Sequence, residues 1–149
     1  AQIFQNINKK INYHIYDMYE VNLLQYYYLK MNSFNPNLGV KKNGINLISK
    51  IKDLRTISNN NKVDLFIANW SLSEFPLNFR KKFIPIIKKS KYSIICFQEK
   101  FEKINNSRFF KQLTINLKNN YNFKLVDFDY YNKSIFNSSN HKMLIIKHK

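Results

Sequence analysis

Short apolar runs alternate with amphipathic stretches along most of the chain. The apolar runs are rich in Ile, Val, Phe and Tyr and predict strands near 12–17, 45–49, 63–69, 92–98, 123–130 and 142–147. The stretches between them predict helices over 1–10, 21–32, 77–90 and 106–120, with 50–57 a short helix or turn. Such alternation predicts an α/β fold, a mostly parallel sheet with helices on both faces. The last two strands follow each other directly, so we expect an antiparallel hairpin at the C-terminus.

Local signals refine two of these helices. Ser73 is expected to cap the helix over 77–90, Pro76 fits its first turn, and Pro85 should kink or split it. The helix over 21–32 carries Leu24, Tyr27, Tyr28 and Met31 on one side. The aromatic runs 26–28 and 109–110 could stack on nucleic acid bases, but their helical spacing favours packing in the core.

The charge balance is strongly basic, with a formal net charge of +16 from 25 Lys and Arg against 9 Asp and Glu. This raises nucleic acid or another polyanion as a partner. However, the arginines are confined to Arg55, Arg80 and Arg108, and the lysines accompany heavy use of Asn, Ile, Tyr and Phe. We therefore favour compositional drift over a functional basic surface.

Other compositional features narrow the class of protein. No apolar run approaches the roughly 20 residues that cross a bilayer, so no membrane partner is expected. Cys96 is the single cysteine, which allows no disulfide within the chain and suits the cytoplasm. The histidines are scattered, and no metal site is expected.

Two strand ends carry residues suited to a ligand site. The run VDLFIAN, 63–69, passes into Trp70 and Ser71, and the strand over 12–17 ends at Asp17. In Rossmann-like folds, an acid at the end of the second strand lies about 20 residues after a glycine-rich turn. That count places the turn before Ala1, so we expect a single domain over 1–149 that lacks its first strand and glycine-rich loop. The alternative is that Asp17 only caps the next helix.

Four stretches together resemble class I S-adenosylmethionine-dependent methyltransferases, and most closely the putative sugar O-methyltransferase family. They are IYDMYEVNLLQYYYLKMN, VDLFIANWSLSEFPLNFRKKF, IICFQEKFEKINNSRFF and the closing hairpin. The stretch IANWSLSEFP is the most distinctive. Asp17-Met18-Tyr19 keeps the acid where many such enzymes have Asp-Leu-Pro, and the glycine motif of the family has no counterpart here.

The resemblance implies S-adenosylmethionine as the cofactor and assigns residues to it. Asp17 would accept hydrogen bonds from the ribose, and Met18 would pack by the adenosine. Asp53 would contact the adenine amine, although an exposed helix acid is the favoured alternative. Residues 69–71 (Asn69, Trp70, Ser71) would lie next to the methyl donor, in one crevice with Asp17, and Trp70 could instead be a core aromatic.

The resemblance also implies a small-molecule or glycan acceptor, methylated on a sugar hydroxyl. Glu74 is the candidate catalytic residue, because methyl transfer needs a positioned acceptor oxygen and removal of its proton. Ser73, Gln98 and Asn106 are candidates for binding the acceptor, although Ser73 and Glu74 also suit a helix N-terminus. Two further readings stay open: a non-catalytic module that binds nucleic acid or another polyanion, and a degenerate methyltransferase.

Overall fold

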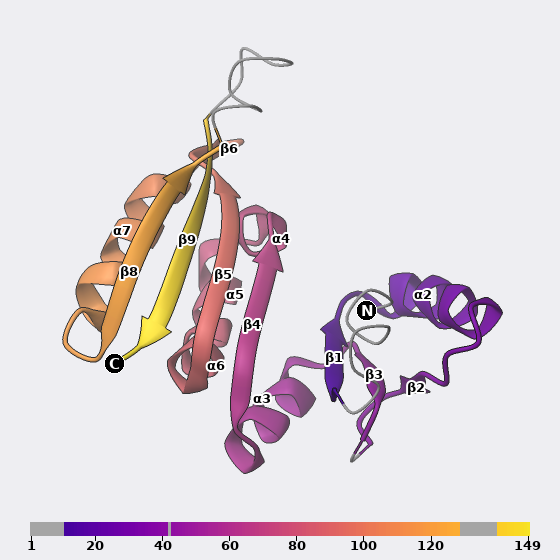
Figure 1. Ribbon diagram of the computed structural model, residues 1–149. Helices are drawn as coiled ribbons and strands as arrows, with labels where there is room; N and C mark the ends of the chain where they lie inside the picture. Colours follow the sequence, from indigo (N-terminus) through magenta and orange to yellow (C-terminus); the bar gives the residue numbers. More distant parts are fainter. Residues whose placement is uncertain (1–10, 42, 129–139) are drawn as a thin grey trace. The chain divides into compact units, whose positions relative to one another are not determined.

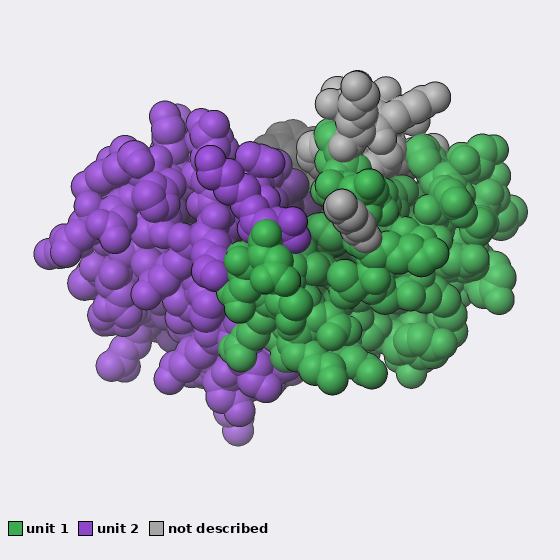
Figure 2. Space-filling model, turned by 90° about the horizontal axis from the view of Figure 1, so that it is seen from below, with its two compact units in different colours: residues 1–60 green, residues 61–149 purple. Residues whose placement is uncertain are grey.

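The computed structural model describes residues 11–41, 43–128 and 140–149. The chain divides into two compact units, residues 1–60 and residues 61–149 (Figure 2). Each unit has its own sheet, and the predicted single domain stays a prediction. The helix predicted over 1–10 lies outside the described residues.

In its described residues, unit 1 holds a parallel three-stranded sheet with two helices, and the strand order is β1-β3-β2. Its elements are β1 (Tyr13–Tyr16), α2 (Tyr19–Met31), β2 (Asn37–Leu38), β3 (Ile45–Ile48) and α3 (Ile51–Asn60). The predicted strands over 12–17 and 45–49 and the predicted helix over 21–32 are confirmed. The short strand β2 was not predicted, because it lies in a stretch whose Pro36 and Gly39 indicate a loop.

The core of unit 1 forms where α2 packs on the central strand. Leu29 of α2 clusters with Ile45 and Leu47 of β3, and Tyr26 packs against this cluster. Tyr27 and Tyr28, by contrast, are 64% and 56% exposed. The expectation of core packing is therefore right for Tyr26 and wrong for the other two tyrosines. Leu24 and Met31 are exposed as well, so the side of α2 that faces the sheet of unit 1 is the one that contains Leu29 and the buried Asn22.

Unit 2 holds a mixed four-stranded sheet of order β4-β5-β9-β8. Its strands are β4 (Val63–Asn69), β5 (Ser90–Gln98), β8 (Tyr121–Asp127) and β9 (His141–His148). β4 and β5 are parallel, whereas β9 runs antiparallel to both β5 and β8. The predicted C-terminal hairpin is thus confirmed, and its second strand lies inside the sheet.

The helices of unit 2 follow its parallel strands. They are α4 (Ser71–Glu74), α5 (Leu77–Arg80), a 3-10 turn (Lys81–Phe83), α6 (Ile84–Lys89) and α7 (Asn106–Leu117). A short hairpin, β6 (Lys100–Phe101) with β7 (Ile104–Asn105), precedes α7 and was not predicted. The helix predicted over 77–90 is split, as Pro85 indicates, and Pro85 lies in the first turn of α6. The capping role expected of Ser73 is wrong, because Ser73 lies inside α4.

In unit 2 the helices cover one face of the sheet. Phe97 of β5 packs on Phe110 of α7, with ring centroids 4.2 Å apart. On the opposite face, Leu65 and Ile67 of β4 are 41% and 37% exposed. In Figure 1, α6 and α7 lie behind this sheet. The prediction of helices on both faces therefore does not hold for the described residues of this unit, while the α/β class is confirmed.

Candidate functional site

In unit 2, the candidate site residues gather where the parallel strands end. Asn69 of β4 pairs with Cys96 of β5, and the Trp70 amide donates to the Cys96 carbonyl at 2.9 Å. Gln98, the last residue of β5, lies opposite His141, the first residue of β9. The end of the sheet where β4 and β5 finish and β9 begins therefore brings together Asn69, Trp70, Gln98 and His141.

Trp70 turns the chain sharply at this end of the sheet. Its φ of 57° lies in the left-handed region, which is uncommon for a bulky residue and is found where surrounding contacts hold the backbone. The indole Nε1 donates to His141 Nδ1 at 2.8 Å, which makes Nδ1 the acceptor nitrogen of that imidazole. The ring also lies 6.2 Å from the ring of Phe128. Trp70 is half-buried and anchored by polar and aromatic contacts.

His141 was missed from the sequence, where the histidines look scattered. The antiparallel pairing of the last two strands was predicted, but the pairing of β9 with β5 was not. That second pairing is what carries His141 to Gln98 and Trp70. A hydrophobic pattern indicates which face of a strand is buried, but it does not indicate which strands pair with it. No signal in the sequence therefore located this histidine.

Arg80 holds together the two segments that follow β4 and β5. Its side chain is fully buried. It donates to the Phe75 carbonyl at 2.6 Å, to Asn106 Oδ1 at 2.5 Å, and to the Ser73 carbonyl. Burial lowers the pKa of this guanidinium from its usual value. Sequence reasoning missed this residue because a charged residue in an amphipathic helix normally points to solvent.

The residues predicted to contact the acceptor fall into two groups. Ser73 and Asn106 are fully buried. Ser73 Oγ donates to the Trp70 carbonyl at 2.6 Å, and Asn106 Nδ2 donates to the Gln98 carbonyl at 2.8 Å. These two side chains therefore position the backbone at the strand ends. Glu74 is exposed and Gln98 is half-buried, so both are open to a ligand.

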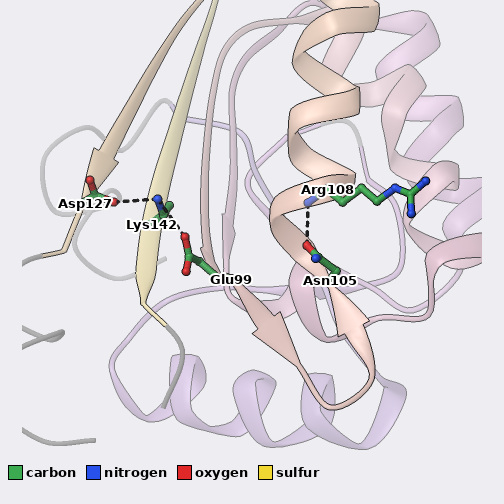
Figure 3. Close-up of polar contacts among 5 residues, drawn as sticks. All are labelled: Glu99, Asn105, Arg108, Asp127 and Lys142. Atoms are coloured by element: carbon green, nitrogen blue, oxygen red, sulfur yellow. Dashed lines mark hydrogen bonds and ion pairs between the residues drawn. The ribbon is translucent and has the colours of Figure 1, made fainter. Parts of the chain in front are cut away.

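A charged cluster lies at the same end of the sheet of unit 2. Lys142 Nζ lies 3.0 Å from Glu99 Oε1 and 3.2 Å from Asp127 Oδ1 (Figure 3). The hydrogen bond to Glu99 is the largest of several effects that raise the pKa of Lys142. Figure 3 also shows Asn105, whose Oδ1 accepts from the Arg108 amide at 2.9 Å and caps α7.

In unit 1, Asp17 lies directly after β1 with its carboxylate held in place. Oδ1 accepts from the Met18 amide at 2.8 Å, and Oδ2 accepts from Gln25 Nε2 at 3.1 Å. The alternative reading of Asp17 as the cap of α2 is wrong, because Met18 occupies the N-cap position and the helix has no side-chain cap. Met18 itself is 67% exposed beside this carboxylate.

Two more residues of unit 1 bear on the site. Asn22 is fully buried, and its Nδ2 donates to Ser49 Oγ at 2.9 Å, which joins the segments that follow β1 and β3. Its Oδ1 has no hydrogen-bond partner in the described structure. Asp53 is half-buried in the first turn of α3, where a carboxylate is favoured by the helix dipole. That position accounts for Asp53 without a ligand.

The candidate residues are thus divided between the two units. Asp17, Met18 and Asp53 belong to unit 1, and the others belong to unit 2. The shared crevice for Asp17 and Asn69–Ser71 stays a prediction. Within the described ranges there is no group of three His, Cys, Asp or Glu that could hold a metal ion, nor a helix that could span a membrane.

No protein-family model matches the chain. No curated protein matches it either.

Proposed function

We propose that the chain is part of an S-adenosylmethionine-dependent O-methyltransferase that acts on a sugar hydroxyl. The observation that carries the proposal is the strand order. In unit 1, β1 is an edge strand next to β3, and in unit 2, β4 is an edge strand next to β5. Within the described residues, β1 and β4 each pair on one side only.

Within each unit, this order corresponds to part of a doubly wound sheet. The Rossmann order is 3-2-1-4-5-6, and β3, β1, β4 and β5 correspond to its strands three, two, four and five. The first strand of that order has no counterpart in the described residues. The antiparallel β9 between β5 and β8 resembles the final strands of class I methyltransferases, whereas the short β2 has no counterpart in this order.

Asp17 suits the ribose of the cofactor. A carboxylate offers about four lone-pair positions, and the Met18 amide and Gln25 occupy two of them. The remaining positions can accept from two ribose hydroxyls, while the exposed Met18 side chain offers an apolar surface to the adenine. When bound, S-adenosylmethionine supplies an electrophilic methyl group on a sulfonium.

In unit 2, the residues at the strand ends would receive the acceptor. Glu74 is exposed in α4, directly after the Trp70 turn, and can accept the proton of an acceptor hydroxyl. Arg80 fixes the backbone on both sides of Glu74, because it binds the carbonyls of Ser73 and Phe75. Trp70 and Gln98 then supply an aromatic face and an amide, a combination that suits a sugar.

The coding sequence immediately upstream of Ala1 tests the fold. An apolar strand followed by a glycine-rich turn should be found there, since backbone amides in such a turn bind the cofactor. An upstream sequence with neither feature would contradict the proposal.

Calorimetry with S-adenosylmethionine tests the site in a protein that includes this upstream segment. Asp17→Ala should weaken binding roughly 10- to 150-fold, because a hydrogen bond to a charged group contributes about 1.5–3 kcal/mol. Asp64→Ala is the control, since Asp64 is an exposed acid at the other end of β4. Glu74→Gln should leave cofactor affinity unchanged and lower methyl transfer to sugar acceptors. Equal affinity of the Asp17→Ala variant and the unaltered protein would remove the physical support for the site.

A further inference from the structure

The sheet of unit 2 has an apolar face that no helix among the described residues of the unit covers. Strand pairing places Leu65 opposite Tyr92 and Ile67 opposite Ile94, and β9 continues the face with Ile145 and Met143. We call Leu65, Ile67, Tyr92, Ile94, Ile145 and Met143 the open face. Leu65, Ile67 and Tyr92 are 41%, 37% and 36% exposed, and the other three are half-buried.

The pairing of β4 with β5 favours a cover on this part of the face. All-parallel sheets are buried and apolar on both faces, and β4–β5 is the parallel pair of this mixed sheet, whereas β9 runs antiparallel to β5 and β8. Here the opposite face is covered, since Ile95 and Phe97 of β5 are buried and Phe97 packs on α7. A helix on the open face would complete the three-layer arrangement of α/β proteins.

Charge beside the open face specifies which kind of helix fits. Lys147 of β9 and Lys124 of β8 are exposed on the same side of the sheet as Ile145. The chain as a whole carries a net charge of +16, so a second copy would meet like charge. Carboxylates beside the apolar stripe of a helix would pair with these lysines.

We propose that the open face binds an amphipathic α-helix from outside the described residues, with carboxylates flanking its apolar stripe. The apolar stripe lies over β5, between β4 and β9, and carboxylates on the β9 side face Lys147 of β9 and, from the neighbouring strand β8, Lys124. A helix with side chains is about 10–12 Å across, so it spans about two to three strands at their spacing of about 4.8 Å. The inference does not depend on the proposed function.

A designed pair of peptides tests this proposal with the 149-residue chain. Both are 18-residue amphipathic helices with the same leucine stripe, flanked by Glu in one and by Lys in the other. Fluorescence anisotropy of the labelled peptides should show binding of the Glu-flanked helix and at least about tenfold weaker binding of the Lys-flanked one. Equal affinities, or no binding of the Glu-flanked helix, would overturn the proposal.

Two protein variants locate the binding surface. Ile67→Glu places a charge on the open face and should weaken the Glu-flanked peptide at least about tenfold. Leu125→Glu adds the same charge on the opposite face of the sheet, where Leu125 is 54% exposed, and should change the affinity less than about twofold. Equal losses in both variants would refute the assignment. If circular dichroism shows that Ile67→Glu fails to fold, the peptide pair on the unaltered chain decides.

Two other occupants are separate outcomes of the same set of measurements. Concentration-dependent dimers in sedimentation, lost in Ile67→Glu and kept in Leu125→Glu, would assign the face to a second copy. Binding to phosphatidylserine vesicles with the same dependence on Ile67 would assign it to a membrane surface. Either result would overturn the proposal.

Discussion

Replacement of Arg80 should strongly destabilise unit 2. The guanidinium is fully buried and has no carboxylate among its hydrogen-bond partners, which are the Ser73 and Phe75 carbonyls and Asn106 Oδ1. Each hydrogen bond to a charged group contributes about 1.5–3 kcal/mol, so the three sum to about 4.5–9 kcal/mol. Desolvation of the cation offsets several kcal/mol of this sum. For Arg80→Met, which keeps most of the apolar volume, we therefore expect a loss of about 3–5 kcal/mol.

The measurement is urea unfolding followed by the fluorescence of Trp70, the single tryptophan of the chain, which lies in unit 2. Arg80→Lys should also be destabilising, because one ammonium cannot reproduce a planar fork of donors. Arg108→Met is the matched control: Arg108 is exposed and contributes to the Asn105 cap of α7 through its backbone amide, which the substitution keeps, so its loss should stay within about 0.5 kcal/mol. A loss below about 1 kcal/mol for Arg80→Met would refute the reasoning that buried carbonyls depend on this cation.

Three further predictions concern single contacts. Burial lowers the pKa of His14, so the folded state binds fewer protons than the unfolded chain, and unit 1 should lose stability as the pH falls through about 6.5 toward that lower pKa. Urea midpoints at pH 5 and 7.5 should show this dependence, and it should be weaker in His14→Gln; equal dependence in the two proteins would contradict it. Lys142→Met should cost about 1 kcal/mol in dilute buffer and less in 1 M salt, because its ion pairs are partly exposed; a loss that is independent of salt would refute an ionic cause. Trp70→Phe should cost about 0.5–1.5 kcal/mol by circular dichroism, since it removes the donor to His141, and an unchanged midpoint would argue against that bond.

The strands and long helices of this protein could be predicted from local pattern. The run 63–69 is short, apolar and β-prone, and it forms β4 with the predicted bounds. The helix predicted over 106–120 also follows from local pattern. The break at Pro85 follows from local chemistry, because proline has no amide hydrogen to donate to the carbonyl four residues earlier in a helix. The two-residue strands were missed, because pieces of this length have no periodicity of their own.

The candidate site was predictable only in part. Strand ends drew attention to Asp17, Asn69 and Trp70, and the structure places each at the carboxyl end of a parallel strand. Ser73 and Asn106 look like ligand-binding polar residues in the sequence, but their polar atoms bond to the protein itself. Side-chain burial depends on which neighbours close over a turn, and no local pattern carries that information.

The sequence by itself determined the α/β class, the bounds of the main elements and the antiparallel ending, because each depends on residues close together in the chain. Tertiary structure alone decided which side of α2 faces its sheet, that β9 lies between β5 and β8, and that Arg80 is buried. The physical reason is the same in each case. Packing and strand pairing join residues far apart in the chain, and several arrangements satisfy the same pattern of apolar and polar positions until the whole unit is assembled.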